Sequence, residues 1–145
     1  MKEHCRFFII LFFASCSCES YYGYKDLGSN YYLYYEGTRT DIIHARDEKS
    51  GREGSGFPVI PARVTRVEFN ERYIIALNEI YSTGTRNFWI IDKKKKELAL
   101  ANMDRREPYE KYWMAGVSGP MDLTSFYAEL KKKNIKLRFK SSTDN

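Results

Sequence analysis

The stretch RYIIALNEIY, residues 72–81, decides the fold. Its four consecutive apolar residues at 74–77 indicate a strand that is buried on both faces at the centre of a sheet. A turn sequence, STGTR at 82–86, separates it from a second apolar segment, NFWIID at 87–92, which is interpreted as the neighbouring strand. Four lysines at 93–96 then end that strand.

Upstream segments extend the sheet. Residues 62–69 (ARVTRVEF) alternate between apolar and charged side chains, the pattern of a half-buried strand. Pro58 and Pro61 hold the chain extended before it. Residues 30–36 (NYYLYYE) and 40–45 (TDIIHA) lie on either side of a Gly-Thr turn, so we expect a hairpin. Consecutive strands joined by short turns predict an antiparallel meander.

The helix that the sequence predicts most clearly lies near the C-terminus. Its apolar side chains recur at i, i+3, i+4 and i+7 and form one stripe: Leu123, Phe126, Tyr127 and Leu130. Asp122 or Thr124 supplies the N-cap, and the lysines at 131–133 complement the helix dipole in the last turn. Residues 135–139 alternate again and return either as a last strand or as an extended tail.

The fold expected from these elements is α+β, an antiparallel β-sheet meander of about four to six strands packed with one C-terminal helix. A single domain occupies residues 30–140, and residues 141–145 fray. Residues 97–117 have no assigned role within it, and their first part either continues a strand or makes a helical turn. Residues 16–29, interrupted by glycine and serine, form a tether whose tyrosines can dock on the domain.

The first twenty residues, MKEHCRFFIILFFASCSCES, differ from the rest of the chain. Lys2 and Arg6 precede an unbroken apolar run at 7–13, which is too short to cross a bilayer as a helix. Small residues follow the run at once. A basic start, a short apolar core and a small-residue cleavage site are typical of a secretion signal, so we expect residues 1–15 to be removed.

The order Phe13-Ala14-Ser15-Cys16 resembles the lipobox of bacterial lipoproteins. In that family the signal is cut before the cysteine, and the cysteine is lipidated. The resemblance implies that Cys16 is the lipidation site and that the lipid attaches the protein to a membrane of the bacterial cell envelope, the outer membrane rather than the inner. The alternatives are an ordinary secreted protein and a cytoplasmic protein with an apolar N-terminus.

Further short motifs resemble small bacterial envelope lipoproteins of unknown function, of the kind abundant in anaerobic gut bacteria. They are DLGSNYYL at 26–33, IPARV at 60–64, YIIA at 73–76, FWIID at 88–92 and SGPM at 118–121. The resemblance covers residues 16–139 and implies a lipid-anchored α+β domain. It transfers no catalytic residue to this chain, because that family has no assigned site.

Composition and residue spacing argue against several classes of function. The three cysteines, Cys5, Cys16 and Cys18, all precede the domain, so no disulfide connects its core. A Cys-x-Cys pair has too few ligands for a structural zinc site, and we expect no cofactor. The net charge of +5 is mildly basic. An envelope location makes nucleic acid an unsuitable partner and leaves anionic glycan, lipid headgroups or an acidic protein.

The residues offer little for catalysis. His44 is the single histidine beyond the leader, and no G-x-S-x-G serine motif accompanies it. The carboxylates, among them Asp41 and Asp92, are interpreted as solvated surface charges rather than as an acid–base pair. We therefore expect a protein that is not an enzyme.

Two features favour recognition instead. Seven of the 12 tyrosines fall between residues 21 and 35, and strand alternation places Tyr32 and Tyr34 on one face, opposite the face with Tyr31. A charged, glycine-rich segment at 46–56, which includes Arg52, is expected as an exposed loop. The interpretation is a protein-binding accessory or inhibitory module, including an immunity factor against a toxin. The alternative is a glycan-binding module that uses Tyr32 and Tyr34 as stacking rings. The oligomeric state is not predicted.

Overall fold

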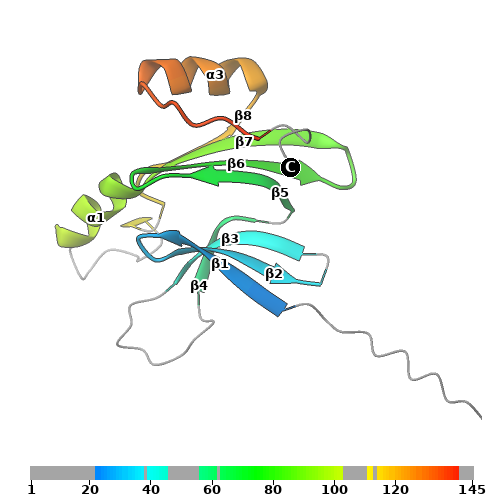
Figure 1. Ribbon diagram of the computed structural model, residues 1–145, viewed down its shortest axis with the longest axis horizontal. Helices are drawn as coiled ribbons and strands as arrows, with labels where there is room; N and C mark the ends of the chain where they lie inside the picture. Colours follow the sequence, from blue (N-terminus) through cyan, green and yellow to red (C-terminus); the bar gives the residue numbers. More distant parts are fainter. Residues whose placement is uncertain are drawn as a thin grey trace, which may run out of the picture.

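The computed structural model describes residues 22–37, 39–45, 56–61, 63–102, 111–112 and 114–140. Within them, eight strands form two antiparallel four-stranded sheets, each with its strands in sequence order (Figure 1). The first sheet consists of β1 (Tyr22–Gly28), β2 (Tyr31–Glu36), β3 (Arg39–Ala45) and β4 (Gly56–Ile60). The second consists of β5 (Val64–Phe69), β6 (Tyr73–Ile80), β7 (Thr85–Asp92) and β8 (Val117–Met121). The helices are α1 (Lys93–Ala101) and α3 (Leu123–Lys132).

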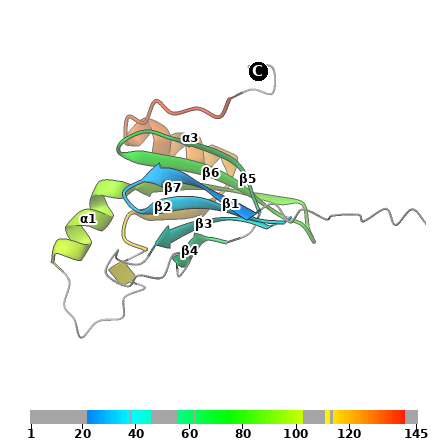
Figure 2. The ribbon, with the colours of Figure 1, turned by 60° about the horizontal axis from the view of Figure 1, so that its bottom comes forward.

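The two sheets and α3 are stacked as three layers, and α1 lies at one end of the stack (Figure 1 and Figure 2). One core lies between the sheets, and a second lies between the second sheet and α3. β6 contributes to both cores, because Ile74 and Ala76 face the first while Ile75 and Leu77 face the second. The prediction that residues 74–77 are buried on both faces is confirmed.

The α+β class, the antiparallel strand order and the C-terminal helix are confirmed. The strands are more numerous than expected, and they divide into two sheets, with Pro61 in the connection between β4 and β5. β1 falls within residues 16–29, which the sequence indicated as a tether, and it pairs along its length with β2. Glycine in β1 and the Gly-Pro step in β8 have low strand propensity, so the sequence did not indicate either strand clearly.

The four lysines at 93–96 begin helix α1 rather than merely ending a strand. Helical periodicity buries Lys93 and Lys96 and exposes the two lysines between them. The Lys93 ammonium donates to the backbone carbonyls of Leu27 and Asn70, the latter at 2.7 Å, and the Lys96 ammonium donates to the carbonyl of Ser29. α1 thereby joins the β1–β2 turn of the first sheet to the β5–β6 turn of the second.

Helix α3 begins at the predicted cap. The Asp122 carboxylate accepts a hydrogen bond from the backbone N–H of Ser125 at 2.7 Å, which lowers the pKa of Asp122. Phe126 and Leu130 are buried, and the residues that follow α3 run as an extended tail rather than a strand. The tail covers the second core with Ile135, Leu137 and Phe139.

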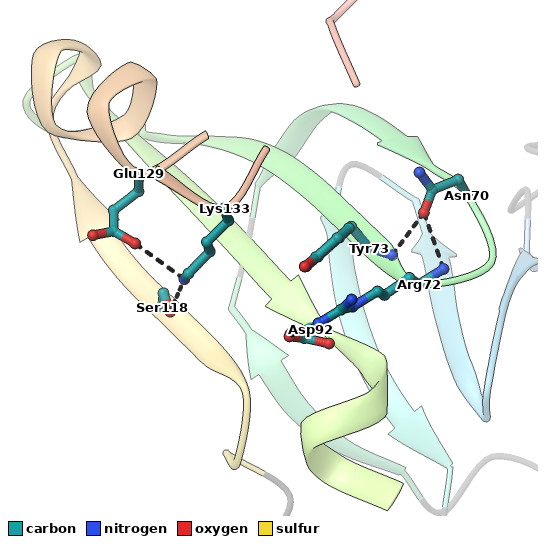
Figure 3. Close-up of polar contacts among 7 residues, drawn as sticks. All are labelled: Asn70, Arg72, Tyr73, Asp92, Ser118, Glu129 and Lys133. Atoms are coloured by element: carbon teal, nitrogen blue, oxygen red, sulfur yellow. Dashed lines mark hydrogen bonds and ion pairs between the residues drawn. The ribbon is translucent and has the colours of Figure 1, made fainter. Parts of the chain in front are cut away.

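Polar contacts attach α3 and the β5–β6 turn to the second sheet (Figure 3). The Lys133 ammonium lies 3.2 Å from the Glu129 carboxylate and donates to the Ser118 hydroxyl of β8 at 3.3 Å. The Asn70 side chain accepts hydrogen bonds from the backbone N–H groups of residues 72 and 73 and so closes the turn. Arg72 lies 3.4 Å from the buried carboxylate of Asp92, and this hydrogen bond raises the pKa of Arg72.

Candidate functional site

The tyrosines of β2 divide between two environments. Tyr31 and Leu33 are buried in the core between the sheets, and Tyr35 packs against it. Tyr32 and Tyr34 are half-buried and lie on the opposite, outer face of the first sheet. The predicted alternation is therefore confirmed, and both tyrosines named from the sequence stand on one surface.

Strand register brings further residues to that surface. Tyr34 pairs with Tyr24 of β1 on one side and with Asp41 of β3 on the other. The Tyr24 ring is 70% exposed and meets the Tyr32 ring edge to face, with centroids 5.5 Å apart and an interplanar angle of 85°. Arg39 lies two residues before Asp41 and therefore on the same face. We call Tyr24, Tyr32, Tyr34, Arg39 and Asp41 the tyrosine face.

Asp41 is buried, which corrects the expectation that it is a solvated surface charge. Its side chain is only 4% exposed, and Oδ2 accepts a hydrogen bond from Nε of Arg39 at 2.6 Å. Among the described residues, Oδ1 has no hydrogen-bond partner. A charge-assisted hydrogen bond to a buried carboxylate fixes the arginine, whose side chain remains 57% exposed. Arg39 therefore presents its other N–H donors to solvent on the same face of the sheet as the tyrosine rings.

The remaining residues named from the sequence do not join this face. Cys16 and Arg52 lie outside the described residues. His44 belongs to β3 and pairs in register with Tyr31, a core residue. Asp92 is buried, contrary to the expectation of a solvated charge, and it forms an ion pair with an arginine of the β5–β6 turn.

The sequence did not predict that Tyr24, Arg39 and Asp41 belong to the tyrosine face. Tyr24 lay in the segment interpreted as a tether, because Gly23, Lys25 and Asp26 break the apolar–polar alternation that indicates a strand. The Arg39–Asp41 pair is spaced by two residues, which in a strand places both side chains on one face.

The geometry defines a two-sheet α+β domain whose first sheet carries tyrosine and arginine side chains on its outer face. The chain belongs to the family described as protein of unknown function DUF3997, whose model matches residues 28–143. The match spans β2 to α3 and the tail that follows. Neither the curated proteins nor the solved structures include a match to this chain. In the part of the chain that the structure describes, the helices are too short or too polar to cross a membrane.

Proposed function

We propose that this chain is a non-enzymatic, lipid-anchored protein of the bacterial cell envelope that binds a protein partner through the tyrosine face. The observation that carries the proposal is the exposed Arg39, held by a buried carboxylate on the same face of the sheet as the exposed Tyr24 ring. Tyrosine and arginine are the residue types enriched where binding energy concentrates in protein interfaces. An arginine that is already ordered loses less conformational entropy on binding.

The arrangement of the rings favours a protein partner over a glycan. A flat platform formed by two coplanar rings suits a sugar ring, but Tyr24 and Tyr32 are nearly perpendicular. Perpendicular rings enclose an aromatic corner that accommodates a side chain. The donors of Arg39 match a carboxylate or carbonyl of the partner. An inhibitory or immunity role against a toxin is the specific form of this function that we favour testing first.

A glycan remains the second candidate function because one ring of the face is mostly exposed. The Tyr24 ring is 70% exposed and can stack on a sugar, while the arginine elsewhere on the face can bind its hydroxyl groups. The nature of the captured molecule distinguishes the two candidates.

The proposed anchor places the tyrosine face close to the membrane. If Cys16 carries the lipid, β1 starts at Tyr22, six positions further along the chain. Six residues reach at most about 20 Å when fully extended. The partner must then be a membrane protein, a membrane-bound molecule or a molecule that arrives at the membrane surface.

Site-specific photo-crosslinking in living cells tests the proposed function. A photoreactive phenylalanine analogue replaces Tyr24 in the full chain, and a matched variant replaces Tyr81, which is 83% exposed at the end of β6 in the other sheet. We expect a discrete protein adduct from position 24 and none from position 81. A heterogeneous polysaccharide adduct at position 24 would favour the glycan. No adduct, or equal adducts at both positions, would contradict a role for the face.

A further inference from the structure

A second concave surface lies on the opposite side of the domain from the tyrosine face. It is a groove of about 870 Å³ between the outer face of the second sheet, helix α3 and the extended tail. Ile75 and Leu77 of β6 and Phe88 of β7 form its floor, but these side chains are at most 9% exposed because α3 and the tail cover them. Phe126 and Leu130 of α3 are also buried beside the floor. The tail contributes Ile135, Leu137 and Phe139. The lining is therefore continuous with the second core.

The lining of the groove includes apolar side chains that are exposed and do not belong to the second core. Leu123 and Tyr127 belong to the predicted apolar stripe of α3, yet their side chains are 50% and 58% exposed. Both line the groove. Exposed apolar side chains that gather at a concave surface mark a binding site more often than isolated ones do.

Basic side chains surround this apolar surface. Arg66, Arg86, Lys131 and Arg138 line the groove together with one carboxylate, Glu79. Glu79 lies 4.0 Å from Arg86. Within the described ranges, no carboxylate pairs with Arg66, Lys131 or Arg138. Three cations next to an apolar surface complement a ligand that combines an anionic group with an apolar body.

We propose that the groove binds a single-chain anionic amphiphile, with the acyl chain against the exposed Leu123 and Tyr127 side chains and a carboxylate among Arg66, Lys131 and Arg138. The volume falls within the range of roughly 300–1,000 Å³ typical of small-molecule sites. This binding activity is separate from the protein partner proposed for the tyrosine face.

The position of the floor within the sheet favours an acyl chain over an extended peptide. β6 and β7 are both interior strands, paired on each side, so their backbone N–H and C=O groups already have partners in the sheet. An extended peptide laid on this floor would bury its own backbone polar groups without partners, which is unfavourable. An acyl chain has no such groups.

Titration with cis-parinaric acid, a fluorescent long-chain carboxylate, tests the proposal. The protein is the full chain with Cys16→Ser, which removes the proposed lipid. We expect saturable binding that palmitate displaces and that methyl palmitate displaces at least about tenfold less well, because the ester has no charge. The rim variant Arg66→Gln with Lys131→Gln and Arg138→Gln should bind at least about tenfold more weakly.

A matched variant separates the effect of the three groove cations on binding from the effect of the net charge of the protein. Lys94→Gln with Lys95→Gln and Lys140→Gln changes the same number of charges at exposed positions outside the groove lining, and it should bind within about twofold of the parent. The apolar leader is identical in every variant, so its contribution cancels. Absence of saturable binding, equal affinity in the rim variant, or stronger displacement by an acidic helical peptide than by palmitate would overturn the proposal.

Discussion

Replacing Asn78 by alanine should destabilise the fold through one buried amide that joins three segments. The side chain of Asn78 in β6 accepts a hydrogen bond from the indole N–H of Trp89 in β7 at 2.7 Å. Its amide N–H donates to the carbonyl of Pro61, in the connection between the two sheets, at 3.3 Å. Both Asn78 and Trp89 are buried. The alanine variant therefore leaves an indole donor in the core without this acceptor.

The size of the loss in unfolding free energy is worked out from two groups that lose a hydrogen bond to Asn78, the Trp89 indole N–H and the Pro61 carbonyl. An unsatisfied buried donor costs about 1–3 kcal/mol. Loss of the hydrogen bond to the Pro61 carbonyl costs less, because Pro61 is exposed and water can replace the amide. We expect the free energy of unfolding to fall by about 2–3 kcal/mol.

Urea unfolding followed by far-ultraviolet circular dichroism measures this loss without relying on tryptophan emission. Trp89→Phe removes the donor, and the double variant completes a thermodynamic cycle in which we expect a coupling of about 1 kcal/mol. Asn102→Ala is the control, because that exposed amide donates a hydrogen bond to the Leu98 carbonyl at the end of α1, and its loss should cost less than about 0.5 kcal/mol. A loss at position 78 no larger than the control, or zero coupling, would refute the reasoning.

Further predictions concern backbone, charge and anchor. Gly119→Ala should cost at least about 2 kcal/mol in urea unfolding, since a Cβ there lies 2.7 Å from the Trp89 ring at φ +136°, whereas Gly84→Ala meets no atom within 4 Å and should cost less. Lys132 and Lys133 lower the pKa of Glu129, so their stabilisation is present above the ordinary value of 4.5 and is lost as the pH falls through the lower folded value. Glu129→Gln should remove that part of the pH dependence of stability. Cys16→Ser should abolish incorporation of a labelled fatty acid into the protein, as metabolic labelling followed by immunoprecipitation would measure.

Each of these predictions has a contrary outcome. Equal losses for the two glycine variants would mean that contact with the tryptophan ring does not limit position 119. An unchanged acid profile for Glu129→Gln would mean that the ion pairs with the lysines are not formed in solution. Fatty-acid incorporation that persists in the Cys16→Ser variant would contradict lipidation at that residue.

The fold could be predicted where local pattern and burial coincide. The run at 74–77 has no polar residue for either face, so its burial between two layers follows from the sequence alone. The alternation of Tyr32 and Tyr34 likewise determines their face. Asp122 was predicted as one of two caps because an aspartate before an apolar stripe can accept the first free N–H groups of a helix.

Other features depend on contacts between distant segments. Lys93 and Lys96 are buried because carbonyl groups more than twenty residues away accept hydrogen bonds from their ammonium groups. No local pattern contains that information. The burial of Asp41 depends in the same way on the packing of the sheet. The groove forms only when α3 and the tail lie across the second sheet, so its lining comes from five separate elements that the sequence presents far apart.

The most direct test of the central claim is capture of a partner from an envelope extract by the full chain, washed at rising salt. The variant Tyr24→Ala with Arg39→Gln is compared with Tyr81→Ala, whose exposed ring lies on the other sheet. We predict that one protein survives a high-salt wash with the parent and the Tyr81 variant and is lost with the tyrosine-face variant. Capture that disappears with salt for every variant, or that the tyrosine-face variant retains in full, would contradict the account.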